Sequence, residues 1–508
     1  MIDQETRRAC RAAPKTAQAR LEREQAKHMY YGLTNALCPT CLQLVRAQIL
    51  IRDEKVIMRK YCPEHGHSEV LVSSDVDWFT KSINSIKPGE RPLSFGTAVN
   101  RGCPYDCGLC PDHQQHTCVA QIEVTNYCNL DCPICYAENR ATWFLDIERY
   151  KFMLREAVKR EGVLNQLNLT GGEPTLHPQI VEMVKIARKN RVSMVLINTN
   201  GLRLAEDDDF VRQLADARAA IYLSFDGFDP EVYKTIRGED LLGKKLQALE
   251  KLEKYNVPVV LVPAIYKGLN DHEIGPMIKL LTESKNIVTI QLQPLFYVGS
   301  CEEEELNPLE KLTLTETIDL VEKGTDGAIK KSDFMYVPCH HPMCGTVCYL
   351  LLDEKNNAVP LTRFVDPNLY LDYIKNRPWV DRQELFNLTR GAVEKIASAA
   401  AIPDMAGGTV EENIEQIIGL VSDCCATNNT RKFRNRIKQI SIHAFMDKYC
   451  WDQQRAQKCC VHVILPTGRM ISFCNYNNLH RYAGSAITYD NQIGINRMKI
   501  RSRQRTNT

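Results

Sequence analysis

The stretch Cys128-Asn-Leu-Asp-Cys132-Pro-Ile-Cys135-Tyr136 decides the fold class of this chain. Its cysteines have the spacing C-x3-C-x2-C, which supplies three thiolates to a four-iron cluster. Ferredoxin clusters have four cysteine ligands, so a three-cysteine loop leaves one iron open to another ligand. A zinc knuckle and a cluster with a distant fourth cysteine are the alternatives, although zinc sites normally use four ligands in short paired spacings. The motif predicts an iron–sulfur centre with an open iron.

Three later segments have the pattern of buried strands that end in glycine or polar side chains. They are Leu167-Asn-Leu-Thr-Gly171-Gly172-Glu173-Pro174-Thr175, Val195-Leu-Ile-Asn198-Thr-Asn200-Gly201 and Ile221-Tyr-Leu-Ser224-Phe-Asp226-Gly227. Polar residues at successive carboxyl ends of strands are how a parallel α/β barrel builds its site. Glycine lets the backbone approach a ligand closely, and a glutamate can accept a hydrogen bond from an ammonium group.

These residues resemble the radical S-adenosylmethionine superfamily, which combines a cysteine triplet with a Gly-Gly-Glu-Pro segment. The resemblance covers roughly residues 118–300 and implies a partial (β/α)6 barrel. It implies that the open iron binds S-adenosylmethionine and that one electron from the cluster releases a 5′-deoxyadenosyl radical. The residues implied to hold the cluster are Cys128, Cys132 and Cys135. The residues implied to contact S-adenosylmethionine are Gly171, Gly172 and Glu173 at the methionyl amine, Asn198, Ser224 and Asp226 at the ribose or carboxylate, and Tyr136.

Composition limits the class of protein further. The chain has 508 residues, enough for two to four domains, and a net charge of only +2, which argues against a general nucleic-acid binder. No apolar run approaches the ~20 residues that span a bilayer, and the charged segment 1–27 lacks a signal core. We therefore expect a cytoplasmic protein. In that setting, 21 cysteines indicate metal sites rather than disulfides.

Apolar and polar patterns predict an α/β protein in several parts. Strands are expected at 121–125, 164–169, 192–198, 220–225, 257–264 and 288–293, and helices at 178–190, 242–255, 312–323, 391–401 and 409–422. Six βα units do not close an eight-stranded barrel, so a lateral opening should remain. The expected parts are an N-terminal helix (1–35), a rubredoxin-like metal-binding domain (36–95), an auxiliary cluster segment (96–119), the barrel (120–300), a C-terminal auxiliary cluster and substrate domain (301–482) and a basic tail (483–508).

Cysteines outside the barrel predict three more metal sites. Cys38-Pro-Thr-Cys41 and Cys62-Pro-Glu-His65-Gly66 flank a hairpin, as in rubredoxins and zinc ribbons, and indicate one iron or zinc ion whose fourth ligand is His65 or a later cysteine. A second triplet, Cys103, Cys107 and Cys110, predicts either an auxiliary cluster closed by Cys118 or a second open cluster; we favour the closed form. Four thiolates for a further cluster come from Cys339, Cys344, Cys459 or Cys460, and Cys474; buried free cysteines are the alternative.

The cysteine layout as a whole resembles the archaeal tetraether lipid synthases and their methanogen relatives. The matching segments include Gly102-Cys-Pro-Tyr-Asp-Cys-Gly-Leu-Cys110-Pro, Cys339-His-His-Pro-Met-Cys344 and Cys459-Cys-Val-His462 with Phe473-Cys474-Asn-Tyr476-Asn. This resemblance implies one radical cluster, two auxiliary four-iron clusters and one rubredoxin-like iron. It also implies an archaeal diether lipid as substrate, coupling of terminal sp3 carbons of two isoprenoid chains, and an external electron donor.

Alternatives and unassigned residues remain. A radical methylase of a pterin cofactor would share the cluster but need a polar pocket for a ring, and a multi-cluster electron carrier would need no S-adenosylmethionine site. The basic stretches 431–438 and 497–505 are either solvated or make peripheral contact with anionic lipid. Six cysteines have no assigned role: Cys10, Cys301, Cys348, Cys424, Cys425 and Cys450.

Overall fold

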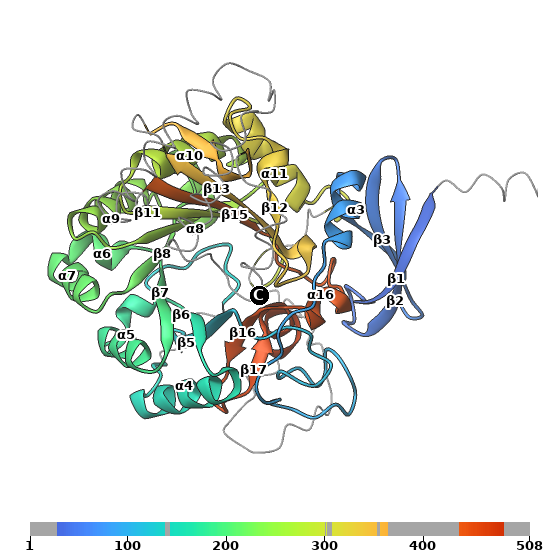
Figure 1. Ribbon diagram of the computed structural model, residues 1–508, viewed down its shortest axis with the longest axis horizontal. Coiled ribbons are helices and arrows are strands. Elements are labelled where there is room, and N and C mark those ends of the chain that lie inside the picture. The colour runs from blue at the N-terminus through green and yellow to red at the C-terminus, as the bar shows by residue number, and fades with distance from the viewer. Residues whose placement is uncertain are drawn as a thin grey trace, which may run out of the picture.

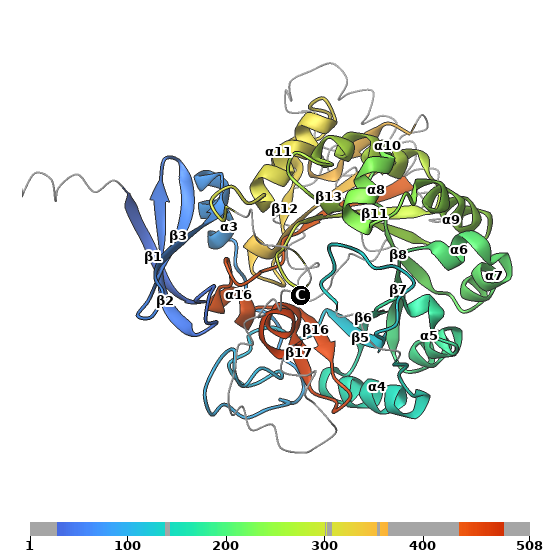
Figure 2. The same cartoon turned by 180° about the vertical axis from the view of Figure 1, so that it is seen from behind.

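A computed structural model describes residues 28–137, 143–299, 301, 307–352, 356–363 and 436–481. Within them, a large parallel α/β core carries a small antiparallel sheet at one side (Figure 1), and the view from behind shows the same arrangement (Figure 2). Several expected features lie outside the described residues: the helices at 391–401 and 409–422, the basic tail, residues 1–27 of the N-terminal helix, and Cys10, Cys424 and Cys425.

The core is built on one mixed sheet. Its strands are β5 Val119–Thr125, β6 Leu164–Gly171, β7 Val192–Thr199, β8 Ala220–Ser224, β9 Val259–Val262, β10 Ala264–Ile265, β11 Ile287–Pro294, β12 Met335–Tyr336, β13 Gly345–Leu352, β14 Ala358–Pro360, β15 Ile437–His443, β16 Val461–Ile464 and β17 Met470–Ser472. Their order is β12-β13-β15-β11-β9-β8-β7-β6-β5-β16-β17, with β10 beside β11 and β14 beside β13. The sheet therefore has two separate ends among the described strands and forms an open barrel.

The α/β fold predicted from the sequence is confirmed. The six expected strands are β5, β6, β7, β8, β9 and β11, and neighbours among them pair in parallel. The C-terminal segment does more than expected, because its strand β15 pairs in parallel with β11 and its strand β16 pairs in parallel with β5. Residues that the sequence assigned to a separate C-terminal domain thus extend the barrel at both sides.

Helices cover the outer face of this sheet. They are α4 Ile147–Glu161, α5 Ile180–Lys189, α6 Leu202–Glu206, α7 Asp208–Asp216, α8 Pro230–Arg237, α9 Leu242–Lys254, α10 Ile274–Glu283 and α11 Leu314–Gly324. Two short helices of the C-terminal segment, α16 Gln453–Gln457 and α17 Phe473–Asn475, lie elsewhere. Short 3-10 or π turns occur at 174–176, 271–273, 331–333, 342–344, 361–363 and 476–480. Several helices start at a capping aspartate; for example, Asp146 accepts from two backbone N–H groups of α4.

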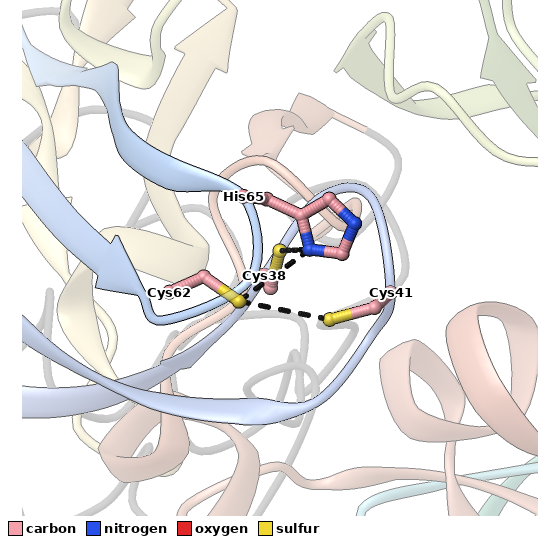
Figure 3. A group of neighbouring side chains, drawn as sticks. All are labelled: Cys38, Cys41, Cys62 and His65. Atoms are coloured by element: carbon pink, nitrogen blue, oxygen red, sulfur yellow. Dashed lines mark hydrogen bonds between the residues drawn. The ribbon is translucent and has the colours of Figure 1, made fainter.

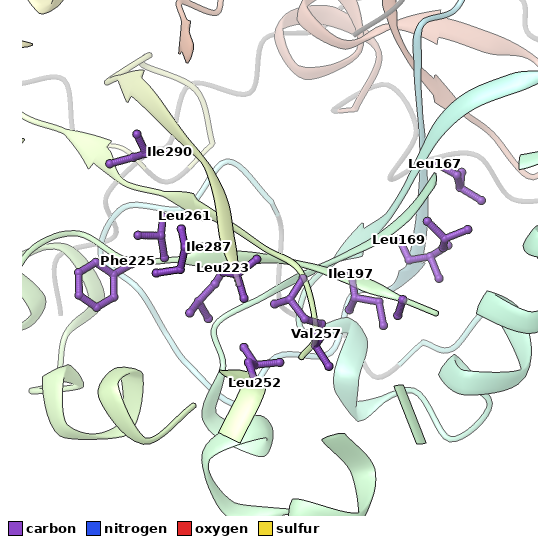
Figure 4. Packing of buried hydrophobic residues seen from close by; sticks show 14 of the residues in the cluster. Leu167, Leu169, Ile197, Leu223, Phe225, Leu252, Val257, Leu261, Ile287 and Ile290 are labelled. Carbon is purple, nitrogen blue, oxygen red and sulfur yellow. The ribbon is translucent and has the colours of Figure 1, made fainter. Parts of the chain in front are cut away.

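The two faces of the strands differ in chemistry. Leu167, Leu169, Ile197, Leu223 and Leu261 are fully buried and belong to the core cluster that packs against the helices (Figure 4). Successive residues of a strand point to opposite faces, so the residues between them point into the barrel. Those inward residues are largely polar: Gln121, Asn168, Thr170, Asn198, Tyr222, Gln291 and Gln293.

The N-terminal sheet is a four-stranded antiparallel meander. Its strands are β1 Met29–Leu37, β2 Leu44–Arg52, β3 Lys55–Cys62 and β4 Gly66–Ser73, and helix α3 Val76–Asn84 follows. Residues 29–35, expected as the end of a helix, instead form most of β1, because their backbone pairs with β2 along nearly the whole strand. The sheet contacts the C-terminal segment: Lys60 Nζ donates to the carbonyl oxygens of Leu37 (3.1 Å) and Tyr449 (2.5 Å).

None of the helices in the described ranges is both long and apolar enough to cross a membrane.

Candidate active site and metal centres

The cysteine loop is fixed by the two glycines that end strand β6. The N–H of Gly172 donates to the Thr125 carbonyl and that of Glu173 donates to the Tyr127 carbonyl, both at 2.8 Å. A Cβ at Gly171 would lie 2.0 Å from the Thr125 oxygen, and one at Gly172 would lie 2.3 Å from the Tyr127 oxygen. The glycines are therefore needed for contact between two backbone segments, in addition to the approach to a ligand that was expected from the sequence.

A cavity of about 220 Å³ opens beside this loop. The sequence-predicted residues that line it are Cys128, Cys132, Cys135, Tyr136, Gly171, Gly172, Glu173, Asn198 and Ser224. They come from the loop and from β6, β7 and β8, so the carboxyl ends of neighbouring parallel strands meet there as the sequence led us to expect. Asp226 is not among the lining residues.

Glu173 is held by a fixed set of donors. Its Oε1 accepts from the hydroxyls of Thr175 (2.6 Å) and Thr199 (2.7 Å), and its Oε2 accepts from the Asn200 N–H (2.7 Å). The side chain is 1% exposed. Because the Asn200 N–H is the one donor to Oε2 within the described residues, this oxygen keeps a lone pair with which to accept from an ammonium group.

Asp226 acts on the cavity through Arg237, a residue that the sequence analysis missed. The Asp226 carboxylate accepts from Arg237 Nε (2.7 Å) and Nη2 (2.9 Å), and from the Ala264 N–H (3.0 Å). Burial lowers the pKa of Arg237, but the adjacent Asp226 raises it more, so the net pKa is raised and the cation is retained. Arg237 lines the cavity. A basic residue in the last turn of a helix normally indicates a surface charge, so the sequence carried no signal of this role.

Lys245 is a second cation that the sequence did not reveal. It lies on helix α9 and its Nζ donates to the Asn200 carbonyl (2.6 Å) and to Ser224 Oγ (2.8 Å). Burial, followed by the neighbouring Arg237, lowers its pKa to about 7. The Ser224 hydroxyl at the cavity wall is therefore oriented by a buried amine.

The cavity residues fit S-adenosylmethionine and a three-thiolate cluster. The buried Asn198 Oδ1 and Tyr266 Oη line the cavity and lack a hydrogen-bond partner within the described part of the chain, as expected of groups that pair with a ligand. Glu173 and Arg237 supply opposite charges for a zwitterionic amino acid. Burial raises the pKa of the Cys128 thiol to about 12 and also raises that of Cys132, so bound metal is what would stabilise these thiolates.

The N-terminal sheet brings together a compact ligand group. The sulfur atoms of Cys38, Cys41 and Cys62 and a ring nitrogen of His65 all lie within 4.8 Å of one another (Figure 3). His65 Nδ1 is 3.5 Å from Cys62 Sγ and 3.8 Å from Cys38 Sγ. Of the two fourth ligands considered from the sequence, the structure places His65 in the group. Three cysteines and one histidine are a set that binds tetrahedral zinc.

The structure groups Cys118 differently from the prediction. Its sulfur lies within 4.8 Å of those of Cys339 and Cys460, all three buried, rather than closing the Cys103 triplet. Pairing of β5 with β16 is the cause: the N–H groups of Cys118 and Val119 both donate to the Cys460 carbonyl, at 2.9 and 3.0 Å. His116 Nε2 lies 3.7 Å from Cys118 Sγ. Three segments far apart in the sequence thus form one buried thiol group suited to metal.

The predicted C-terminal set is divided between two places. Cys344, Cys459 and Cys474 line a small cavity of about 20 Å³, in which Arg455 Nε donates to Cys344 Sγ (3.3 Å), while Cys339 joins Cys118. Cys460 also lines this small cavity, although its sulfur belongs to the group with Cys118 and Cys339. The remaining triplet, Cys103, Cys107 and Cys110, is buried; Cys107 Sγ lies 3.6 Å from Ser472 Oγ.

Two family models match separate parts of this chain. The family model of the radical SAM superfamily matches residues 122–281, and the model of the HMPTM N-terminal zinc ribbon domain matches residues 30–74. Among solved structures, Streptococcus suis SuiB bound to S-adenosylmethionine is similar to 42% of this chain and 47% of its own, with 18% identity and a TM-score of 0.35.

Two curated relatives differ in how much of their length is matched. The probable GTP 3′,8-cyclase of Thermococcus kodakarensis is 34% identical over 174 residues, and the chain spans only 55% of it. The 7,8-dihydro-6-hydroxymethylpterin dimethyltransferase of Methanocaldococcus jannaschii is 33% identical over 480 residues, which are 88% of this chain and 94% of that protein. The latter favours the pterin alternative over the expected lipid synthase. The chain belongs to the family of this pterin dimethyltransferase, within the radical S-adenosylmethionine superfamily.

Proposed function

We propose that the protein is a radical S-adenosylmethionine methyltransferase that adds methyl groups to carbon in a reduced pterin. The observation that carries this proposal is the mixed lining of the barrel cavity, which offers amide and phenol groups together with aromatic rings. A pterin is a flat heterocycle whose edge carries several hydrogen-bond donors and acceptors. The relative matched over most of this chain is named for such a substrate.

In this proposal the residues around the cysteine loop bind and orient the cofactors. Cys128, Cys132 and Cys135 hold the cluster, Glu173 accepts from the methionyl ammonium, and Arg237 faces the carboxylate. When bound, the cluster and S-adenosylmethionine supply one-electron chemistry at carbon, with electrons from an external donor. Asp226 and Lys245 keep Arg237 and Ser224 in place from behind the cavity wall.

The same lining opposes the lipid-coupling hypothesis. Hydrocarbon chains cannot hydrogen-bond, so a chain placed against Gln121, Tyr222 and Gln293 would leave the remaining donors and acceptors of these amide and phenol groups unpaired, at a cost of about 1–3 kcal/mol for each group. A pterin edge can satisfy those groups.

The test is an anaerobic assay of the reconstituted protein. It contains S-adenosylmethionine, of which one molecule supplies the 5′-deoxyadenosyl radical and another the methyl group for each methylation, together with a strong reductant that supplies the electrons and 7,8-dihydro-6-hydroxymethylpterin. A parallel reaction contains archaeal diether phospholipid. Mass spectrometry should show the pterin heavier by one or two CH2 units and the lipid unchanged. A coupled lipid with unmodified pterin would overturn the proposal and restore the lipid synthase.

A variant of the cysteine loop checks that the chemistry starts at the cluster. Cys128→Ala should abolish 5′-deoxyadenosine formation and methylation, because it removes one of three ligands from the open cluster. Chromatography of the nucleoside products measures this. Cys348→Ala is the control, since Cys348 is buried in strand β13, outside the cavity and both compact thiol groups. If Cys128→Ala still produced 5′-deoxyadenosine, the radical centre would lie elsewhere, with the Cys103 triplet as the next place to examine.

A further inference from the structure

Inside the barrel, one tyrosine accepts hydrogen bonds from two glutamines on a strand that is not adjacent to its own. Tyr222 Oη accepts from Gln291 Nε2 at 2.7 Å and from Gln293 Nε2 at 2.8 Å. Tyr222 lies on β8 and both glutamines lie on β11, while β9 separates the two strands. The tyrosine crosses β9 where the strand carries Val260 and Val262, whose side chains are short. These hydrogen bonds thus connect β8 and β11 across the inside of the barrel.

In this arrangement the Tyr222 hydroxyl remains available as a donor, and the glutamine carbonyl oxygens remain available as acceptors beside it. A phenol oxygen can accept two hydrogen bonds and still donate its own hydrogen. Burial raises the pKa of Tyr222, so the phenol stays neutral and keeps that hydrogen. Each glutamine uses an N–H on Tyr222, and neither carbonyl oxygen has a hydrogen-bond partner within the described ranges. Tyr222 and Gln293 both line the cavity.

An aromatic wall completes the same cavity. Tyr136, Phe296 and Phe473 line it, with ring centroids 6.1 Å apart for Tyr136 and Phe296 and 5.8 Å apart for Tyr136 and Phe473. Tyr136 directly follows the last cysteine of the loop, so this wall begins next to the cluster site. Aromatic side chains stack on flat rings largely regardless of ring type, whereas donor and acceptor groups discriminate among ring edges.

We propose that Tyr222 and Gln293 form the subsite that recognises the lactam edge of the substrate ring. In this arrangement the Tyr222 O–H donates to the ring carbonyl and Gln293 Oε1 accepts from the adjacent ring N–H. Gln291 is a positioning residue, because it acts on the substrate through Tyr222. The inference rests on the proposed function and makes it specific: the preferred ring carries a carbonyl next to an N–H, as 4-oxo pterins do.

The experiment compares two ring edges on the reconstituted holoprotein with S-adenosylmethionine present. Anaerobic equilibrium dialysis gives the Kd of 7,8-dihydro-6-hydroxymethylpterin and of its 2,4-diamino analogue, in which the carbonyl is replaced by an amino group. We expect wild-type protein to prefer the 4-oxo ring. Tyr222→Phe should weaken binding of the 4-oxo ring by about 10-fold and change binding of the diamino ring far less, because only the 4-oxo ring loses an accepted hydrogen bond. Gln293→Leu should weaken 4-oxo binding to a similar degree.

Tyr255→Phe is the matched control. Tyr255 Oη donates to Asp208 on the outer side of the barrel, so its removal should not alter the preference between rings. If Tyr222→Phe keeps the wild-type preference for the 4-oxo ring over the diamino ring, the proposed subsite is wrong. The proposed function still stands in that case, provided that the wild-type protein methylates the pterin. A wild-type protein that neither binds nor methylates the pterin would overturn both. The ratio of the two Kd values distinguishes a loss of recognition from a loss of folding, because a barrel that is only less stable would bind both ligands more weakly to the same degree.

Discussion

The pair formed by Asp226 and Arg237 shows how one buried charge can be held for a ligand. Asp226 is 0% exposed and binds the guanidinium through two hydrogen bonds, so the ion pair is nearly free of solvent. Removing one partner of such a pair leaves the other charge unpaired and typically costs about 3–5 kcal/mol. The arginine that faces the cavity therefore depends on a carboxylate that does not line it.

Asp226→Asn should destabilise the fold and weaken cofactor binding together. We expect the free energy of unfolding to fall by about 3 kcal/mol and the affinity for S-adenosylmethionine to drop by about 10-fold, since Arg237 loses its fixed orientation. Urea unfolding and equilibrium dialysis measure the two effects. Asp209→Asn is the control, because its pair with Arg212 is more than half exposed and is screened by solvent. Equal losses in both variants would contradict this account.

His177 predicts a dependence of stability on pH. Burial lowers its pKa below the ordinary value, and the neutral ring both donates to the Leu145 carbonyl (2.9 Å) and accepts from the Gln179 N–H (3.1 Å). The unfolded chain therefore takes up a proton first as the pH falls. The stabilisation is complete above the unfolded pKa of about 6.5 and is lost as the pH falls toward the lower folded value.

His177→Gln should remove part of this acid sensitivity. The loss of unfolding free energy between about pH 7 and about pH 5 should be smaller than in wild type, by about 1 kcal/mol. Urea unfolding at both pH values is the measurement. His272→Gln serves for comparison, because that side chain is 63% exposed. A wild-type-like pH dependence in His177→Gln would show that the buried ring does not titrate as described.

At the scale of elements, sequence reasoning succeeded where the pattern was local. The run Leu167-Asn-Leu-Thr170 alternates aliphatic and polar residues, which identifies a strand whose two faces meet different surroundings. Nothing in the local sequence of strand β16 shows that it pairs with β5. Cys460 reaches Cys118 through that pairing, and Cys339 comes from a third segment, so neither partner could be predicted. The fold could be predicted from the local alternation of aliphatic and polar residues, whereas the cysteine groups depend on contacts between segments that are distant in the sequence.

The N-terminal sheet should depend on its metal. Its four ligand residues come from two turns at one end of β1–β4, and burial raises the pKa of Cys41 to about 11, so deprotonation requires a cation. Cys41→Ser should remove one equivalent of zinc and lower the melting temperature of this sheet, because folding and zinc binding are linked in ribbons. Elemental analysis with thermal unfolding measures this. Cys301→Ser, outside both compact groups, should retain the full zinc content; loss of zinc from it as well would contradict the assignment.

At the scale of the whole molecule, Lys60 joins the zinc ribbon to the C-terminal segment. Burial lowers its pKa to about 8, and its Nζ donates to backbone carbonyls on both sides of the interface. Nearby, Asn35 Nδ2 donates to Gln453 Oε1 at 2.7 Å. A buried amine that satisfies carbonyls of two segments ties their positions together more firmly than an apolar contact of equal size, since a loose fit would leave those groups unpaired.

Lys60→Met should therefore loosen the ribbon without unfolding the barrel. We expect faster amide hydrogen exchange in β1–β4 and near residues 448–452, with unchanged exchange in β6–β8. Mass spectrometry of the exchanged peptides reports this. Lys55→Met is the matched variant, because Lys55 is an exposed residue at the start of β3. Uniform acceleration across the barrel would contradict a role confined to the interface.

The buried group of Cys118, Cys339 and Cys460 sets an order for making the protein on the ribosome. All four ribbon ligands, from Cys38 to His65, leave the exit tunnel early and close around a single hairpin. The nascent chain can therefore load its zinc while most of the barrel is still untranslated, since N-terminal domains generally fold first. The second group cannot exist until residue 460 has emerged and β16 has paired with β5. A chain that ends before β16 thus contains all four ribbon ligands but lacks Cys460, the third thiol of the buried group.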